Sequence, residues 1–169
     1  MKSLLVLFSY HHNNTEKIAN VFAEVLDAQI KTPQQINPEE LQEFSLIGFG
    51  SGIYDGKHHK VLLNLANKLP QVHNKKSFIF STSGWTKYAT ENHSPLREKL
   101  QSKGYMIVDE FNCAGFDTYE GDKDANLIEK LIVKIVKLKG GINKGRPNAE
   151  DLKHAEEFAL NLKQNLQKK

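Results

Sequence analysis

Short apolar runs recur along the chain and alternate with segments in which apolar residues return every third or fourth position. The apolar runs predict strands, and these cover residues 4–8, 28–31, 44–49, 77–80 and 105–108, with the run at 28–31 the weakest. The other four runs are too uniformly apolar to leave one face in water. We therefore expect the sheet that they form to be covered on both faces.

The periodic segments predict helices over residues 15–26, about 58–69 and 96–102. Ser94-Pro95 predicts the start of the third helix, because serine is a good N-cap and proline suits the first helical position. Asn37-Pro38 repeats this pattern earlier in the chain. A final helix follows Asn148 as its N-cap, and its apolar stripe comprises Leu152, Ala155, Ala159, Leu162 and Leu166.

The alternation of strands and helices predicts an α/β fold, in which one domain over residues 1–169 is built on a doubly wound, five-stranded parallel sheet. Ligands of such folds lie at the carboxyl ends of the strands. The segments that follow the strands at this edge are residues 9–17, 50–59, 81–88 and 112–119. Three of them are rich in glycine, serine and threonine with an aromatic residue nearby, which suits a flat ligand with a polar edge and an anionic tail.

The first of these segments turns directly into a helix, and the first backbone N–H groups of a helix have no intrahelical partner and attract phosphate. A simpler interpretation is that Asn14 or Thr15 only caps the helix. The position directly after the first strand favours a phosphate site, because doubly wound sheets bind phosphate there.

The helix start Asn14-Thr15-Glu16-Lys17-Ile18-Ala19 resembles the phosphate loop of the flavodoxin family, whose members bind flavin mononucleotide (FMN) without a covalent bond. The segments GFGSGIY, FSTSG, CAGFDTY and GINKGRPNAEDL extend the resemblance over most of the chain and are similar to a short-chain, flavodoxin-like subgroup. Two departures stand in the first loop. Asn13 replaces the usual glycine, and His11-His12 replace small hydroxyl residues. Asparagine tolerates left-handed backbone conformations, so we expect the tight turn to survive.

The resemblance implies FMN as the cofactor and the strand order 2-1-3-4-5. It implies that the phosphate is held by Ser9, Tyr10, His11, His12, Asn13, Asn14 and Thr15. It also implies that the isoalloxazine ring is flanked by Ser51, Gly52, Ile53, Tyr54, Asp55 and Gly56 and by Thr82, Ser83, Gly84 and Trp85, with Tyr54 and Trp85 in contact with the ring. In this role no side chain is catalytic, since the flavin performs the chemistry.

An insertion separates the segment around Asp117 from Gly140-Gly141, where the family usually has a short connection. Residues 120–139 form an expected amphipathic helix after strand 5, with one apolar face and a lysine face, and its basic part spans 123–139. One interpretation is a helix that covers the sheet and exposes its lysines. The other is a docking element for a redox partner or for peripheral contact with an anionic membrane.

Composition narrows the function further. The chain has 169 residues, 25% of them charged, and a formal net charge of +3, which is typical of an ordinary globular protein. Cys113 is the single cysteine, so a thiolate metal cage is excluded, and neither histidine pair has the spacing of a zinc site. Basic residues are not interleaved with aromatic residues, so nucleic-acid binding has little support. No apolar run has transmembrane length, and we expect a cytoplasmic protein.

Three functions remain open at the level of the sequence. The first is an FMN-binding, flavodoxin-like protein that transfers electrons between redox partner proteins. The second is an FMN-dependent reductase or dehydrogenase that acts on a quinone or a porphyrinogen. The third is a cofactor-free module with this fold that serves only for binding, for which the loss of glycine at Asn13 is the best support.

Overall fold

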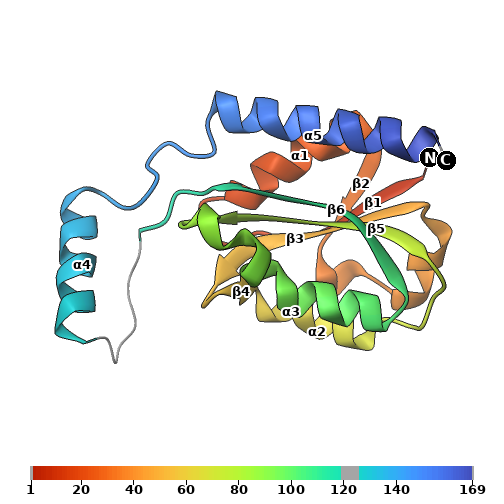
Figure 1. The fold of residues 1–169 in the computed structure, drawn as a ribbon, viewed down its shortest axis with the longest axis horizontal. Coiled ribbons are helices and arrows are strands. Elements are labelled where there is room, and N and C mark those ends of the chain that lie inside the picture. The colour runs from red at the N-terminus through yellow and green to blue at the C-terminus, as the bar shows by residue number, and fades with distance from the viewer. Residues whose placement is uncertain (1, 119–125, 169) are drawn as a thin grey trace.

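The computed structural model describes residues 2–118 and 126–168 (Figure 1). Its strands are β1 (Ser3–Phe8), β2 (Ala28–Lys31), β3 (Leu46–Tyr54), β4 (Lys57–His58), β5 (Lys75–Ser83) and β6 (Tyr105–Ala114). Its α-helices are α1 (Asn14–Leu26), α2 (Lys60–Lys68), α3 (Ala89–Ser102), α4 (Leu127–Leu138) and α5 (Ala149–Gln167). Short 3-10 helices cover Pro33–Gln35, Pro38–Glu43 and Thr86–Tyr88.

Five strands form a parallel sheet in the order β2-β1-β3-β5-β6, and β4 pairs antiparallel with the end of β3. Helices α1 and α5 cover one face of the sheet, and α2 and α3 cover the other (Figure 1). The predicted fold class is confirmed. With the short β4 set aside, the strand order 2-1-3-4-5 is confirmed as well.

Two cores lie on opposite faces of the sheet, and β1 contributes alternate residues to each. Leu4 and Val6 belong to the core under α2 and α3, whereas Leu5 and Leu7 belong to the core under α1 and α5. This alternation follows from the two-residue repeat of a strand, and it explains why the run 4–8 is apolar throughout. The stripe of α5 completes the second core, in which Ala155 and Ala159 are fully buried.

The glycines of β3 make room for aromatic rings from β5. A Cβ atom on Gly50 would lie 2.2 Å from the ring of Phe80, and one on Gly48 would lie 2.5 Å from Phe78. The two phenylalanine rings in turn meet the edge of Phe22 from α1, with centroid distances of 5.3 and 5.6 Å. The Gly-Phe-Gly segment of β3 is thus required by packing on the α1 side.

Strand β6 lies at the edge of the sheet and extends to Ala114, well beyond the predicted end at residue 108. The prediction that this strand is buried on both faces is wrong, since Met106 is 40% exposed. Its polar second half stays in the sheet because its polar side chains have partners: Glu110 pairs with Arg97 of α3, and Asn112 donates to serines of β5.

One predicted helix start is wrong, and another differs from the prediction by two residues. Helix α3 begins at Ala89, so Pro95 lies inside it and Ser94 is not its cap. Burial of Asn92 and His93 extends the helix toward its N-terminus in spite of the proline. Helix α2 begins at Lys60, with His59 as N-cap, because His58 belongs to β4. Asn148 caps α5 as predicted and accepts from the backbone N–H groups of Glu150 and Asp151, both at 3.1 Å.

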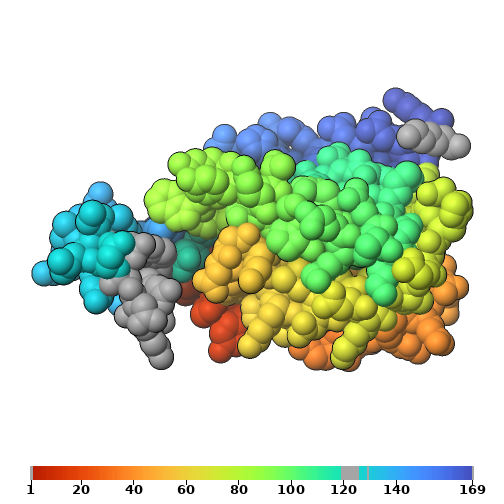
Figure 2. All heavy atoms as spheres, turned by 60° about the horizontal axis from the view of Figure 1, so that its bottom comes forward, coloured from red at the N-terminus to blue at the C-terminus, as the bar shows by residue number. Residues whose placement is uncertain are grey.

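Helix α4 confirms a helix in the predicted insertion over Leu127–Leu138. The start of the predicted helix, at 120, lies outside the described residues. The interpretation that this helix covers the sheet is wrong, because its apolar side chains remain exposed. In both views α4 stands apart from the layered body, at the end where the strands reach their carboxyl ends (Figures 1 and 2).

Candidate functional site

A cleft of about 920 Å³ opens at the carboxyl ends of the central strands. Its volume lies in the upper part of the range of small-molecule sites. Four segments line it: the loop after β1, the β3–β4 hairpin, the loop after β5 with the start of α3, and residues 115–118 after β6. The cleft therefore lies where the topology of a doubly wound sheet predicts a ligand.

All of the sequence-predicted site residues line this cleft except Asn13 and Ser51. Six further residues that the sequence prediction missed also line it: Tyr88, Asn92, Gly115, Phe116, Asp117 and Thr118. Asn92 was missed because the start of α3 was placed too late, whereas Tyr88 belongs to the expected segment 81–88 but was not included among the cofactor residues. The remaining four belong to a segment that was expected at the same edge of the sheet but was not included among the cofactor residues.

Asn13 shapes the first loop through its backbone. It and His12 adopt left-handed conformations, with φ of 52° and 56°, which confirms that asparagine supports the tight turn in place of glycine. Asn13 is the N-cap of α1, but within the described residues its side chain makes no capping hydrogen bond. The first turn of α1 therefore reaches the cleft with backbone N–H groups that no side chain caps.

Asn14 and Thr15 join three of the four segments instead of capping the helix, so the simpler interpretation of this loop is wrong. Asn14 Nδ2 donates to the carbonyl oxygen of Phe116 at 2.7 Å, and the hydroxyls of Thr15 and Thr82 are hydrogen-bonded at 2.8 Å. Gly115 permits this junction, since a Cβ atom there would lie 3.0 Å from Asn14 Nδ2. Asn14 Oδ1 is buried without a hydrogen-bond partner among the described residues.

The second wall of the cleft is a β-hairpin that the sequence analysis missed. Asp55 and Gly56 form its two-residue turn with φ of 49° and 71°, and Tyr54 pairs with Lys57. Asp-Gly between two strands is the strongest short hairpin signal, so the pair could have revealed this element. Ser51 supports the hairpin from behind, because its Oγ accepts from the backbone N–H of His59 at 3.0 Å and donates to the carbonyl of Gly52 at 2.7 Å.

The Tyr54 side chain folds back over the hairpin into the cleft. A Cβ atom added to Gly52 would lie 3.1 to 3.4 Å from atoms of the Tyr54 phenol. Its ring lies 5.9 Å from that of His11 and 5.0 Å from that of His59, measured between centroids. Burial raises the pKa of the Tyr54 phenol, a hydrogen bond with the backbone of His11 opposes this, and the charge of Asp117 adds to the rise. Tyr54 is therefore a neutral hydroxyl at neutral pH.

The third wall carries exposed aromatic residues. Trp85 is 54% exposed and Tyr88 is 48% exposed, and both line the cleft. Tyr10, on the first loop, is 72% exposed. Large aromatic side chains at the mouth of a cleft present flat apolar surface to a ligand or partner.

A segment after α4 is tied to the rim of the cleft. Asn143 Nδ2 donates to the carbonyl oxygen of Gly84 at 3.0 Å and to that of Gly115 at 3.4 Å. Asp117 and Ile142 form an antiparallel bridge, with N···O distances of 3.1 and 2.7 Å. The GINKGR segment therefore supports the third and fourth walls from outside.

A family model described as a flavodoxin domain matches residues 5–141, which include the four cleft segments. The chain belongs to the flavodoxin family. A relative over its whole length is the uncharacterized protein MJ0298 of Methanocaldococcus jannaschii, with 44% identity over 165 residues, 98% of this chain and 100% of the relative.

Solved flavodoxins share the fold at low sequence identity. A flavodoxin from the domain Archaea is 14% identical, has a TM-score of 0.60 and covers 99% of both chains. Oxidised flavodoxin 2 from Bacillus cereus is 16% identical with a TM-score of 0.64, and the match covers 95% of this chain and 96% of that one. These likenesses establish the flavodoxin fold, and the cleft lies at the carboxyl ends of the strands, where doubly wound sheets bind ligands.

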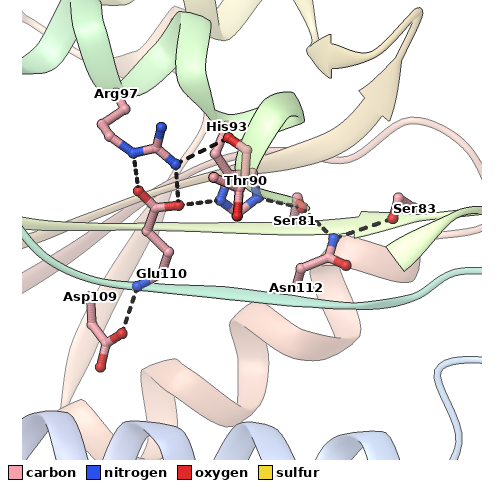
Figure 3. Close-up of polar contacts among 8 residues, drawn as sticks. All are labelled: Ser81, Ser83, Thr90, His93, Arg97, Asp109, Glu110 and Asn112. Atoms are coloured by element: carbon pink, nitrogen blue, oxygen red, sulfur yellow. Dashed lines mark hydrogen bonds and ion pairs between the residues drawn. The ribbon is translucent and has the colours of Figure 1, made fainter. Parts of the chain in front are cut away.

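Behind the third wall of the flavodoxin cleft lies a buried polar network (Figure 3). Ser81 Oγ lies 2.7 Å from His93 Nε2, and His93 Nδ1 lies 2.9 Å from Glu110 Oε2. Arg97 holds the same carboxylate through two nitrogens. Asn112 Nδ2 connects the network to the cleft, since it donates to Ser81 Oγ at 2.7 Å and to Ser83 Oγ at 3.2 Å.

The order Ser81, His93, Glu110 imitates a hydrolytic triad, but its position excludes that role. Ser81 is fully buried and does not line the cleft, and Asn112 already occupies an acceptor position of its hydroxyl. The network instead joins β5, α3 and β6 below the loop that carries Trp85. Burial raises the pKa of Glu110, but the hydrogen bonds from His93 and Arg97 outweigh it and lower that pKa to about 2.

A second buried histidine adjoins this network. His58 is 1% exposed, its ring centroid lies 5.0 Å from that of His93, and its Nδ1 lies 3.0 Å from Ser51 Oγ. Ser51 donates its own proton to Gly52, so His58 Nδ1 is the donor in this pair and Nε2 has no proton. Burial lowers the pKa of His58 well below its usual value, and His93 lowers it further, which keeps the ring neutral.

Cys113 is buried beside Asp151, and burial raises the pKa of its thiol to about 12. This agrees with an inert packing role. Among residues 2–118 and 126–168, no three histidine, cysteine, aspartate or glutamate side chains gather as metal ligands would.

Proposed function

We propose that this flavodoxin binds FMN without a covalent bond in the cleft and transfers electrons between redox partner proteins. The observation that carries the proposal is the uncapped N-terminus of α1 at the cleft, faced by loops that bring Tyr54 and Trp85 to the same cavity. A ligand with a flat ring and an anionic tail fits this cleft, because the helix N-terminus suits the anionic tail and the two aromatic residues suit the ring. FMN supplies the redox chemistry when it is bound.

The donor set of the first loop fits the phosphate and its linker. The backbone N–H groups of Asn14 and Thr15 begin α1, and helix N-termini bind phosphate through such groups. Asn14 Oδ1, which has no partner among the described residues, is an acceptor suited to a hydroxyl donor such as those of the ribityl chain. Ser9, His11 and His12 add polar groups on the same side of the cleft.

The hairpin and the third wall fit the ring. Gly56 and Gly84 line the cleft and leave the backbone open to close approach of a planar group. Tyr54 and Trp85 offer aromatic faces, which exclude water and favour the less electron-rich oxidised ring. The carboxylates of Asp55 and Asp117 are also in the cleft and disfavour added negative charge.

Titration of the apoprotein with FMN, followed by flavin fluorescence quenching and visible absorption, tests the proposal. We expect binding at one FMN per chain, and Trp85→Ala and Asn14→Ala should each weaken it at least about tenfold, because each removes a stacking face or a buried hydrogen bond. Met106→Ala serves as the control, since Met106 is exposed on β6 and does not line the cleft. A wild-type protein that binds no flavin would leave the cofactor-free binding module as the function.

A reductase with a small substrate is the second candidate, and the exposed aromatic residues at the mouth favour it. Tyr10, Trp85 and Tyr88 leave flat apolar surface beside a cleft whose volume lies in the upper part of the range of small-molecule sites. Steady-state oxidation of NAD(P)H with a quinone as acceptor, by the FMN-loaded protein alone, would establish this function. Anaerobic reduction in two separate one-electron steps, with no such turnover, would support the electron carrier.

A further inference from the structure

Helix α4 presents a large apolar surface to water. Its exposed apolar residues are Leu127 at 87%, Ile128 at 71%, Leu131 at 58%, Ile132 at 42%, Ile135 at 44% and Leu138 at 80%. Monomeric proteins rarely expose so many large aliphatic side chains side by side. The helix shares no extensive contact with another described element, so packing against the described part of the chain does not explain this sequence.

The remaining part of the helix surface is basic. Lys130, Lys134 and Lys137 recur with helical spacing and are all exposed, and Lys139 follows directly. Glu129 is the single acidic residue in the sequence from 127 to 139. With 3.6 residues per turn, the three lysines fall on one narrow strip, and the apolar residues occupy more than half of the circumference.

The position of α4 is fixed at its C-terminal end. Gly141 N–H donates to the carbonyl of Val136 at 2.9 Å and ends the helix, and Ile142 then bridges to Asp117. Asn143 continues the connection to Gly84 on the third wall. These bonds hold the base of α4 to the rim of the cleft, at the same end of the molecule as Trp85.

We propose that α4 is an interfacial helix that docks the protein on an anionic lipid bilayer. In this arrangement the apolar residues enter the boundary between headgroups and acyl chains. The lysines of the strip extend their stems to the headgroup level and pair with anionic phosphates. The exposed rings of Trp85 and Tyr88 lie at the same end, and such amphipathic rings prefer the membrane interface.

The pattern on α4 fits a bilayer better than a second copy of the chain. A helix pair buries one strip of each helix, whereas the apolar residues of α4 extend around more than half of its surface. A bilayer surrounds a helix on all sides except the one that faces water, and the lysine strip matches that side. None of the described helices is long and apolar enough to cross a membrane, so α4 would lie along the surface.

Sedimentation of the full chain with lipid vesicles tests the proposal without reference to the flavin. The probes are vesicles of phosphatidylglycerol and phosphatidylcholine in equal parts and vesicles of phosphatidylcholine alone. We expect strong partitioning to the anionic vesicles, weaker partitioning at high salt, and little to the neutral ones. Because FMN is not needed for this readout, failure of the FMN proposal would leave the result unaffected.

Two variants separate the contributions of the two surfaces. Lys130→Gln, Lys134→Gln and Lys137→Gln together should weaken partitioning on the order of 100-fold, since each lysine near an anionic surface gives somewhat less than a tenfold gain. Leu131→Ser with Ile135→Ser should weaken it at least about tenfold. The control combines Lys68→Gln, Lys153→Gln and Lys168→Gln, which remove the same charge from exposed lysines elsewhere and should have little effect.

Three outcomes would overturn the proposal. The wild type could fail to sediment with either kind of vesicle. The serine variant could bind as well as the wild type, which would show that vesicle binding depends on non-specific charge attraction and not on the apolar residues of α4. The wild type could form a dimer that the serine variant abolishes, with no vesicle binding, which would assign the apolar surface to a second copy. Thermal unfolding of each variant, which should match the wild type because α4 lies outside both cores, excludes a folding defect.

Discussion

The hydroxyls of Thr15 and Thr82 meet at 2.8 Å beneath the cleft. Thr15 lies in the first turn of the helix that faces the expected phosphate, and Thr82 lies in the strand that leads to Trp85. Both residues are buried, at 2% and 4% exposure. This single bond therefore sets the spacing between the two ends of the site.

Thr82→Val keeps the shape of the side chain and removes the hydrogen bond. We expect the free energy of unfolding to fall by about 1–3 kcal/mol, because the Thr15 hydroxyl is left buried without this partner. Urea unfolding measures the change. Thr86→Val, at an exposed position in the short 3-10 helix that follows β5, is the matched control and should be close to neutral. Equal stability of both variants would show that the bond contributes nothing to the fold.

Gly50→Ala tests the packing between β3 and β5. The new methyl group would lie 2.2 Å from the Phe80 ring, so we expect a loss of about 1–3 kcal/mol or more through overpacking. Gly84→Ala is the comparison, since its nearest neighbours would be 4.0 Å away and no strain follows. Thermal unfolding of the two variants should separate them clearly. If Gly50→Ala unfolds at the same temperature as the wild type, the rings of the second core can move aside more easily than their close contacts indicate.

His58 should make the protein acid-sensitive. Its pKa in the folded state lies well below 6.5, whereas the unfolded chain binds a proton near that value. The stability that a neutral His58 contributes is therefore complete above pH 6.5 and decreases as the pH falls below it. His58→Gln removes this titration, so its unfolding free energy should depend less on pH between about 6.5 and 5. The same slope in wild type and variant would assign the acid sensitivity to another group.

Glu110 contributes in a lower pH range. Burial raises its pKa, but the partners His93 and Arg97 outweigh this effect and lower the pKa to about 2, from a usual value of 4.5. The stabilisation is present above pH 4.5 and is lost as the pH falls toward 2, and after allowance for partial exposure it is on the order of 2 kcal/mol. Glu110→Gln should lower stability at pH 7 much more than at pH 3. Glu156→Gln, exposed on α5, should show no such difference.

Asp55 should affect the redox potential if the flavin binds as proposed. The structure puts the lysines on α4 and the carboxylates of Asp55 and Asp117 in the cleft. Because negative charge disfavours addition of electrons, Asp55→Asn should make the potential less negative. Anaerobic redox titration of the FMN-loaded protein measures this, and an unchanged or more negative potential would contradict it.

The architecture could be predicted because each central strand is apolar on both faces and each connection carries a periodic segment. Leu4 to Leu7 alone indicate a doubly covered strand. The strand-end loops then followed from topology, which is why most of the predicted residues line the cleft. Local sequence signals were sufficient to predict features that depend on neighbouring residues alone, such as the N-cap at Asn148 and the left-handed turn at Asn13.

The remaining features depend on contacts between distant residues. Nothing near Ser94-Pro95 shows that burial of Asn92 and His93 extends α3, and the Ser81–His93–Glu110 network joins three elements from different parts of the chain. Strand β6 continues through polar residues because Arg97 pairs with Glu110, which is 13 positions away. The β3–β4 hairpin is different, since its Asp55-Gly56 turn could have been predicted from the sequence.

The bridge between Asp117 and Ile142 places the two ends of the insertion next to each other on the body. The loop-closure free energy of an element inserted between two adjacent points grows only slowly with the length of the element. The helix is thus a transplantable unit. A short turn could therefore replace the helix without disturbing either core. The same segment, grafted at the equivalent rim of another flavodoxin, should give that protein the membrane-binding surface proposed here.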